Sequence, residues 1–227
     1  ARNVDPASPF ADALREPERF FVLNPPSAHL EVKGLLAEVS ALAAGDDPAP
    51  LAPEQVEAVR RVVPWTRSLC VGETTGPDGE TVDLVPYVQE HPDLVVKKSW
   101  DYGGKTVFLA KDLEEEATRE RLRAVLGPGA PLDWEALVKH AANDPDDCWV
   151  AQRRVELEPS GLEKALLDGE VEAFAGYVDA STYATHGIAP WGGGGVSRAS
   201  RSRVVNIMGG GGLVPLLPQE VLDLLHS

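Results

Sequence analysis

Apolar positions change their spacing several times along this chain, and each change predicts a different kind of element. Leu30, Leu35, Leu36 and Val39 fall on one stripe at helical spacing, which indicates an amphipathic helix. The same pattern recurs elsewhere, in places with Pro or an acidic residue in the first turn, as is typical of helix starts. We therefore expect helices at residues 29–44, 53–62, 82–90, 114–126, 134–142 and 216–226. Asp133 is the expected N-cap of the helix at 134–142.

Short apolar runs that end at Gly, Pro or charged residues indicate strands instead. Such runs occur at residues 20–23, 94–97, 106–110 and 148–152. Extended chain is expected at 64–67 and a Gly/Pro/Thr loop at 72–79. The remainder, residues 170–217, is predicted to be β-rich, with glycine tracts at Gly192–Gly195 and Gly209–Gly212. This order predicts an α+β fold and disfavours a doubly wound parallel sheet.

Composition narrows the classes of function. A formal net charge of −15 argues against a broad nucleic-acid surface, although it leaves room for one small polyanion in a basic cleft. No apolar run approaches the roughly 20 residues that a membrane helix needs, so we expect no membrane partner. The chain starts at Ala1 without Met or an apolar leader, and we expect a fragment of a longer protein. Cys70 and Cys148 are too few for a disulfide framework, so a reduced, cytoplasmic location is expected.

The most informative segment is residues 94–107, which reads LVVKKSWDYGGKTV. Its spacing from Ser99 to Thr106 approaches the P-loop pattern, but a P-loop begins with Gly and leads into a helix. Here the residues after the glycines are β-branched, aromatic and apolar, which predicts a strand. The segment is therefore expected to be a strand–loop–strand hairpin.

Such a hairpin can bind an anion, because glycines let backbone N–H groups approach phosphate oxygens closely. A lysine on the leading strand would add a positive charge. Lys97 and Lys98 point to opposite faces of a strand, so only one of them can reach the same ligand. The alternative is a plain hairpin with a glycine turn and two solvated lysines.

This segment resembles the nucleotide-binding flap of the ATP-grasp superfamily, and in particular the circularly permuted, glutathionylspermidine-synthase-like branch. In that branch the run is similar to VLKPSxxYGGKGV. Here Lys98 stands in place of the proline and Thr106 in place of a glycine. Four further segments resemble the family in the same order: VKGLL from Val32, VPWTR from Val63, WVAQ from Trp149, and GVSRAS with VNIMGG from Gly195 and Val205.

The resemblance implies two lobes with antiparallel sheets that enclose a nucleotide cleft. We expect residues 1–67 to form lead-in elements, 68–151 the flap subdomain and 152–227 a β-rich subdomain for metal and phosphate, with an upstream domain outside this chain. The implied activity is an ADP-forming ligase that joins a small carboxylate to an amine, a peptide or a thiol through an acyl phosphate. Its implied cofactors are ATP and Mg²⁺. Its oligomeric state stays open.

The resemblance also assigns roles to individual residues. Lys33 and Lys97 would bind the nucleotide phosphates, and the hinge strand that ends at Gln152 would carry adenine. The loop residues Gly103, Gly104 and Lys105 would cover the phosphates. Arg198 would stabilise the transferring phosphoryl group. Asn206 would bind the metal, and Asp179 is the expected source of the carboxylate that the family places at position 204, which here is Val204.

Each assignment has a simpler alternative. Arg198 lies near Arg201 and Arg203, and such a cluster in an acidic protein can be a solvated or salt-bridged edge. Asn206 can be a turn former, and Asp179 a surface residue. The chain as a whole can be a nucleotide-binding or scaffold module without turnover, and the two glycine tracts can form a peptide-binding surface.

Overall fold

The computed structural model describes residues 5, 7–16, 18–20, 32–45, 51–101, 104–165, 170–182, 195–201, 205 and 212–214. The chain divides into two compact units, the first made of Ala1–Asp101 and Lys105–Arg154, and the second of Tyr102–Gly104 and Val155–Ser227. Both contain antiparallel sheets, and the first also contains the described helices, so the expected α+β class is confirmed. The three-part division at residues 67 and 151 stays a prediction.

The helices of the first unit are α1 (Pro9–Arg15), α2 (Lys33–Ala44), α3 (Pro53–Val62), α4 (Leu84–Glu90), α5 (Glu116–Leu126) and α6 (Trp134–Asn143), with a short 3₁₀ helix at Ala110–Asp112. Its strands are β1 (Thr66–Ser68), β2 (Glu73–Thr75), β3 (Thr81–Asp83), β4 (Val95–Lys98), β5 (Val107–Leu109) and β6 (Trp149–Gln152). The second unit contains β7 (Ser160–Ala165), β8 (Val171–Thr182), β9 (Gly195–Ser200) and β10 (Gly212–Val214), paired in the order β10-β9-β8-β7.

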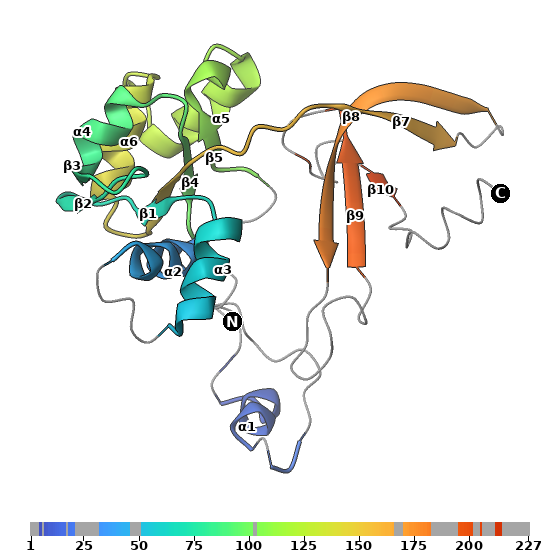
Figure 1. Ribbon diagram of the computed structural model, residues 1–227, viewed down its shortest axis with the longest axis horizontal. Coiled ribbons are helices and arrows are strands. Elements are labelled where there is room, and N and C mark those ends of the chain that lie inside the picture. The colour runs from blue at the N-terminus through green and yellow to red at the C-terminus, as the bar shows by residue number, and fades with distance from the viewer. Residues whose placement is uncertain are drawn as a thin grey trace. The chain divides into compact units, whose positions relative to one another are not determined.

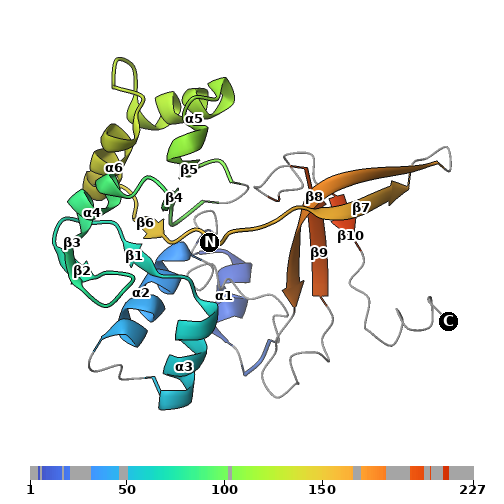
Figure 2. The ribbon, with the colours of Figure 1, turned by 45° about the horizontal axis from the view of Figure 1, so that its top comes forward.

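The first unit is built around the antiparallel sheet β1-β6-β4-β5. Helices α4, α5 and α6 lie on one side of it, and α2 and α3 lie on the other, as the two ribbon views show (Figure 1, Figure 2). Helix α2 packs against β1 and β6. We call the side covered by α4–α6 the core face and the side of α2 the α2 face. Since side chains alternate along a strand, each strand contributes to both faces.

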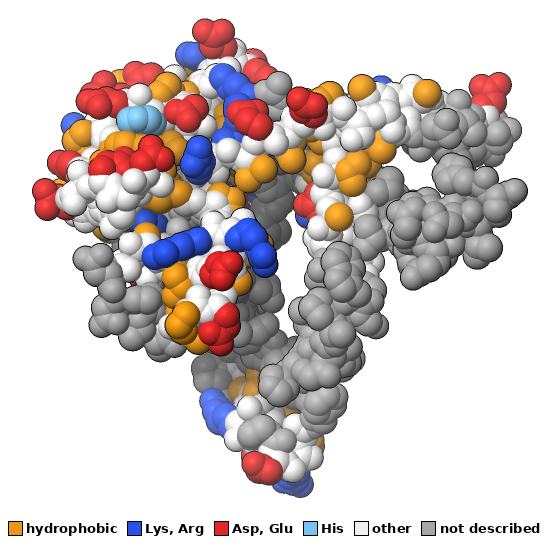
Figure 3. Space-filling view, in the orientation of Figure 1, with side chains coloured by type: hydrophobic (Ala, Val, Ile, Leu, Met, Phe, Trp, Pro, Cys, Tyr) orange, Lys and Arg blue, Asp and Glu red, His pale blue; other side chains and the backbone are white. Residues whose placement is uncertain are grey.

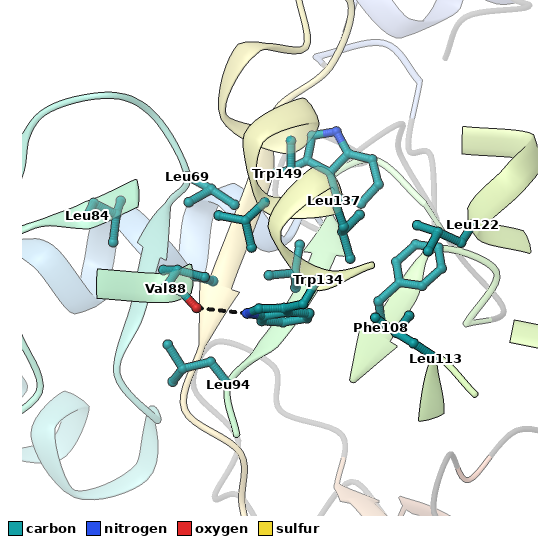
Figure 4. Packing of buried hydrophobic residues seen from close by; sticks show 14 residues of the cluster. Leu69, Leu84, Val88, Leu94, Phe108, Leu113, Leu122, Trp134, Leu137 and Trp149 are labelled. Carbon is teal, nitrogen blue, oxygen red and sulfur yellow. Dashed lines mark hydrogen bonds between the residues drawn. The ribbon is translucent and has the colours of Figure 1, made fainter. Parts of the chain in front are cut away.

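The hydrophobic core of the first unit lies on the core face (Figure 4). Strand residues Val96, Phe108 and Trp149 contact helix residues there, and all three are almost completely buried. The indole N–H of Trp134 donates a hydrogen bond of 2.9 Å to the carbonyl oxygen of Val88, which joins α6 to α4. A buried indole with a partner avoids the cost of an unsatisfied donor.

Most predicted elements of the first unit are confirmed. Helix α3 has the predicted bounds, with Pro53 in its first turn. Asp133 caps α6 as expected, accepting a hydrogen bond of 2.8 Å from the amide of Ala136. The residues after the glycine loop form β5, a strand paired with β4, so the hairpin expectation is confirmed and the P-loop stays excluded.

Other boundaries differ from the prediction. The expected loop at 72–79 is part of the hairpin β2–β3, and Val82 belongs to β3 because it pairs with Thr74. Helix α4 therefore begins at Leu84. Strand β7 was not predicted; it has little apolar periodicity of its own and is held by pairing with β8. Of the other expected elements, residues 21–23, 29–31 and 216–226 lie outside the described residues.

No helix in the described ranges combines the length and the hydrophobicity that crossing a membrane requires.

The placement of the core can be tested by changing valine to alanine at one buried and at one exposed helical position. Val88→Ala removes two methyl groups from a fully buried site, and we expect it to lower the free energy of unfolding by about 2 kcal/mol. Val62→Ala, at a helix position that is 67% exposed, should change it by less than about 0.5 kcal/mol. Urea unfolding measures both, and equal losses would contradict this placement of the core.

Candidate anion-binding site

Lys97 lies on β4 with its side chain on the α2 face. Its register partner on β6 is Val150, and its ammonium donates a hydrogen bond of 2.5 Å to Oε1 of Gln152, further along the same strand. Nε2 of Gln152 in turn donates to Oγ1 of Thr66 at 2.7 Å. Adjacent strands β4, β6 and β1 therefore contribute one side chain each to a chain of hydrogen bonds. Because the acceptor of Lys97 is a neutral amide, its charge is oriented without being neutralised.

Lys33 reaches the same region from the start of α2. Its ammonium donates to the carbonyl oxygen of Asp101 at 2.5 Å and lies 3.5 Å from that of Ser99. The amide of Gly34 donates to Oγ of Ser99 at 2.8 Å. A Cβ atom at residue 34 would lie 3.0 Å from that oxygen, so glycine allows the start of α2 to approach the end of β4. The two predicted nucleotide lysines thus lie at the same end of the sheet.

Electrostatics distinguishes these two lysines from ordinary surface lysines. Burial, with a contribution from the charge of Lys33, lowers the pKa of Lys97 to about 8. Burial also lowers the pKa of Lys33, against the charges of Asp101 and Asp147, which raise it. Within the described part of the chain, neither lysine forms an ion pair with a carboxylate. The protein has a net charge of −15, and its acidic and basic side chains are interspersed over the visible face of the first unit (Figure 3). In this setting, two neighbouring ammonium groups that form no ion pair favour an anionic ligand.

Lys98 occupies the opposite face, as the alternation along a strand predicts. Its ammonium lies 3.4 Å from Oδ2 of Asp147 and 3.8 Å from Oδ2 of Asp144, and 5.7 Å from the centroid of the Trp149 ring. Asp144 also accepts a hydrogen bond of 2.8 Å from the Trp149 indole, which is the main reason that the pKa of Asp144 is lowered. Lys98 is therefore held in a salt-bridge network away from Lys97.

The base of the glycine loop is closed by Asp101. Its Oδ2 accepts hydrogen bonds from the amide of Thr106 at 3.0 Å and from the Thr106 hydroxyl at 2.6 Å, which gives a structural reason for threonine at that position. Gly104 has φ of +73°, a left-handed conformation that favours glycine. The side chain of Lys105 is exposed. Gly103 lies outside the described residues, so its expected contact with phosphate stays a prediction.

Two of the three predicted catalytic and metal residues of the second unit lie on adjacent strands. Asp179 on β8 and Arg198 on β9 are register partners, and Nη2 of Arg198 lies 2.6 Å from Oδ2 of Asp179. The backbone oxygen of Asp179 accepts a hydrogen bond of 3.0 Å from the hydroxyl of Ser197. Nε of Arg198 is buried without a hydrogen-bond partner. Asn206 lies outside the described residues.

The fit of these residues to Mg²⁺ is limited. Mg²⁺ takes one or two protein carboxylates, with phosphate and water oxygens completing its shell. The described residues offer Asp179, whose carboxylate is already paired with Arg198. Across the described ranges, no three side chains of His, Cys, Asp or Glu are placed to hold a metal ion. A metal here would need phosphate oxygens for most of its coordination.

Some side chains that support the lysines are not recognisable from the sequence. Thr66 on β1 and Ser99 directly after β4 were not expected to contribute, because the sequence holds no signal of the partner of a hydroxyl group. Arg67 is 3% exposed, although arginine is seldom buried. Its guanidinium donates to Ser40, Thr74 and the carbonyl oxygen of Thr66, while Nη2 is buried without a partner. Burial lowers the pKa of Arg67.

Gln152 lies on a strand, as expected. It belongs to β6, an interior strand flanked by β1 and β4, so neighbouring strands lie along both sides of its backbone. What it contributes to the site is its side chain, which bridges Lys97 and Thr66. Its expected contact with adenine stays a prediction.

Comparisons of the chain with protein-family models, with curated proteins and with solved structures found no match.

The pKa of Lys97 predicts a pH dependence of stability. Its folded value of about 8 lies below the value of about 10.4 of an unfolded lysine. Between these values the unfolded chain binds the extra proton, so the free energy of unfolding should rise with pH, by less than about 1.4 kcal/mol per unit. Urea unfolding at pH 8 and pH 10 tests this against Lys97→Met, which should lose that part of the slope. An identical slope in the two proteins would contradict the proposed environment.

Proposed function

We propose that this chain is the nucleotide-binding catalytic module of an ATP-grasp-type ligase, an ADP-forming enzyme that joins a small carboxylate to an amine or thiol. The observation that carries the proposal is the pair of lysines at one end of the first unit's sheet, Lys33 and Lys97, held by neutral oxygen acceptors and not by carboxylates. The ATP-grasp resemblance of the surrounding segments supports it. Two lobes enclosing a nucleotide cleft, with the circularly permuted order of segments, are part of this proposal.

The lysines would bind the phosphates through charge. Two ammonium groups at the end of β4, where the glycine loop begins, suit an extended polyanion better than a single carboxylate, since each can meet a different phosphate. Desolvation already destabilises the charged form of Lys97, and a bound phosphate would restore that stability. Phosphate binding would therefore raise the pKa of Lys97, and the site would bind more strongly below about pH 8.

The proposed reaction proceeds in two steps through an acyl phosphate. A substrate carboxylate oxygen attacks the γ-phosphorus of ATP, the bond to the bridging oxygen breaks, and ADP leaves with its electron pair. The amine or thiol then attacks the acyl carbon, and inorganic phosphate leaves. Catalysis of such transfers is mostly alignment and charge stabilisation. The loop amides at Gly103 and Gly104 would cover the β- and γ-phosphates, and the guanidinium of Arg198 would stabilise the transferring group.

Mg²⁺ would supply charge neutralisation at the β- and γ-phosphates. Asn206 and Asp179 would be its protein ligands. Lys105, which follows the loop glycines, would contact the phosphates. For Asp179 to serve, its carboxylate would have to exchange part of its contact with Arg198 at 2.6 Å for the metal.

Nucleotide binding can be tested by thermal unfolding. We expect millimolar Mg-ATP to raise the melting temperature, because a ligand that binds only the folded state stabilises it by mass action. Lys97→Ala should weaken binding about tenfold or more and remove most of this shift. Gln152→Glu should do the same, since a carboxylate in place of the amide would pair with Lys97 and neutralise it.

Lys98→Ala is the matched control, because it deletes the neighbouring ammonium on the opposite face. It should keep the shift with Mg-ATP. Loss of the shift in Lys98→Ala, or an unchanged melting curve of the wild-type protein, would count against the proposal.

A second candidate is a nucleotide-binding module without turnover. One observation in its favour is the ion pair between Asp179, the metal candidate, and Arg198, the catalytic candidate, because each side chain is already engaged by the other. Another is Val204, which stands in place of the family's acid. Such a module would bind Mg-ATP and release no ADP.

Turnover separates the two candidates. For the ligase, ADP release with a panel of small carboxylates and amines should fall by a factor of at least about 100 in Arg198→Met. Nucleotide binding should persist in that variant. ADP release that is the same in wild type and Arg198→Met would remove Arg198 from the mechanism, and binding without any ADP release would favour the second candidate.

A further inference from the structure

The two cysteines of the chain lie 78 positions apart in sequence and opposite each other in the fold. The pairing of β1 with β6 matches Ser68 with Val150, and it continues past the end of β1, because the amide of Leu69 donates to the carbonyl oxygen of Trp149 at 2.8 Å. One step further, the same register places Cys70 directly opposite Cys148.

The hydrogen bonds between β1 and β6 indicate whether the two cysteines occupy a hydrogen-bonded or a non-hydrogen-bonded position. In antiparallel strands, hydrogen-bonded and non-hydrogen-bonded pairs alternate. The single bonds from Leu69 to Trp149 and from Arg153 to Trp65 lie at the positions of hydrogen-bonded pairs at the two ends of the ladder, so the alternation, continued by one residue, makes Cys70 and Cys148 a non-hydrogen-bonded pair. Such pairs have Cα atoms about 4.5 Å apart, within the range of about 4.4–6.8 Å that a disulfide spans. Both side chains point to the same face.

Two further observations concern the reactivity of the pair. Both residues are free cysteines at the surface, so small reagents can reach them. Burial raises the pKa of the Cys148 thiol, and the charges of Asp147 and Cys70 add to this rise.

We infer that Cys70 and Cys148 are a site of reversible oxidation, at which a low-molecular-weight disulfide such as oxidised glutathione converts the two thiols into one cross-strand disulfide. In the first step a cysteine thiolate attacks a sulfur of oxidised glutathione, and one glutathione thiolate leaves. In the second step the other cysteine thiolate attacks the mixed disulfide, and the second glutathione leaves. Two protein thiols are oxidised, one glutathione disulfide is reduced to two glutathione thiols, and these take both protons.

The bond would fix the end of the sheet nearest the lysines. The amide of Ser99 donates to the carbonyl oxygen of Cys148 at 2.7 Å, and the same serine holds Lys33 and Gly34 at the start of α2. Cys148 is therefore hydrogen-bonded to Ser99, the residue that contacts the start of α2. The inference itself does not depend on the proposed function, because it follows from strand register alone.

The test is exposure of the reduced full chain to oxidised glutathione, followed by alkylation and mass spectrometry. We expect the loss of two hydrogens, no alkylation, and a peptide in which Cys70 is linked to Cys148. The second step is intramolecular, so the closed form should exceed the mixed disulfide by about tenfold or more. Glutathione adducts or disulfide-linked dimers as the main products would overturn the inference.

Variants distinguish strand register from simple accessibility. Cys70→Ser and Cys148→Ser should each retain one glutathione adduct. Cys70→Ser combined with Val71→Cys moves the thiol to the next residue of the chain, which is 71% exposed, and should not form the bond. If it forms as readily as in the wild type, the register argument is wrong.

Thermal unfolding gives a second readout. Closing so long a loop should raise the melting temperature of the oxidised wild type by on the order of 5–10 °C. Dithiothreitol should reverse the change. A lower melting temperature after oxidation would show that the bond distorts the sheet and would overturn the inference.

Discussion

The ammonium group of Lys97 is partly buried on a β-sheet, and its hydrogen-bond acceptor is the uncharged amide of Gln152. Burial makes the charged form of an amine costly, and proteins usually reduce this cost with a nearby carboxylate. Here the described surroundings supply an orienting oxygen without an opposite charge. The lowered pKa of about 8 is the direct consequence. A group in this condition gains more from an incoming anion than a solvated lysine does, and this difference is the physical basis of the proposed site.

The end of β4 joins several features that are far apart in sequence. Ser99 contacts the first residues of α2 through its hydroxyl and carbonyl groups, and its amide bonds to the carbonyl oxygen of Cys148. Asp101, two residues later, accepts a hydrogen bond from Lys33 and closes the base of the glycine loop through Thr106. A small displacement of this strand end would therefore move Lys33 and the loop together. This connection places the two cysteines close to the part of the first unit that the proposed ligand would contact.

The second unit shows how one geometry supports two functional interpretations. Asp179 and Arg198 are paired through Oδ2 and Nη2, as expected for a structural salt bridge across two strands, while Nε of Arg198 stays buried without a partner. The same residues have the chemistry that a phosphoryl-transfer site uses, namely a guanidinium and a carboxylate on adjacent strands. A partly exposed ion pair contributes little stability, so its rearrangement around a bound phosphate would cost little. Its function depends on whether such a phosphate binds.

The local sequence determined the features that need only the spacing of residues along the chain. Periodicity and capping predicted α3 and α6, including the cap at Asp133. Alternation along β4 predicted that Lys97 and Lys98 face opposite sides, and the β-branched residues after the glycines predicted a hairpin. The α+β class followed from the order of these elements, and the antiparallel pairing of the sheets agrees with what the family resemblance implied.

Only the tertiary structure decided which side chains meet. The strand β7 depends on its pairing with β8, and the hairpin β2–β3 depends on a ladder between weakly apolar segments. The contact of Lys97 with Gln152, the burial of Arg67 and the opposition of Cys70 and Cys148 all follow from the order and register of β1, β6 and β4. Register joins residues tens of positions apart, and a shift of one residue would turn each of these side chains to the other face. The spacing of residues within each segment holds no information about that choice, because the energy that selects it comes from packing between segments.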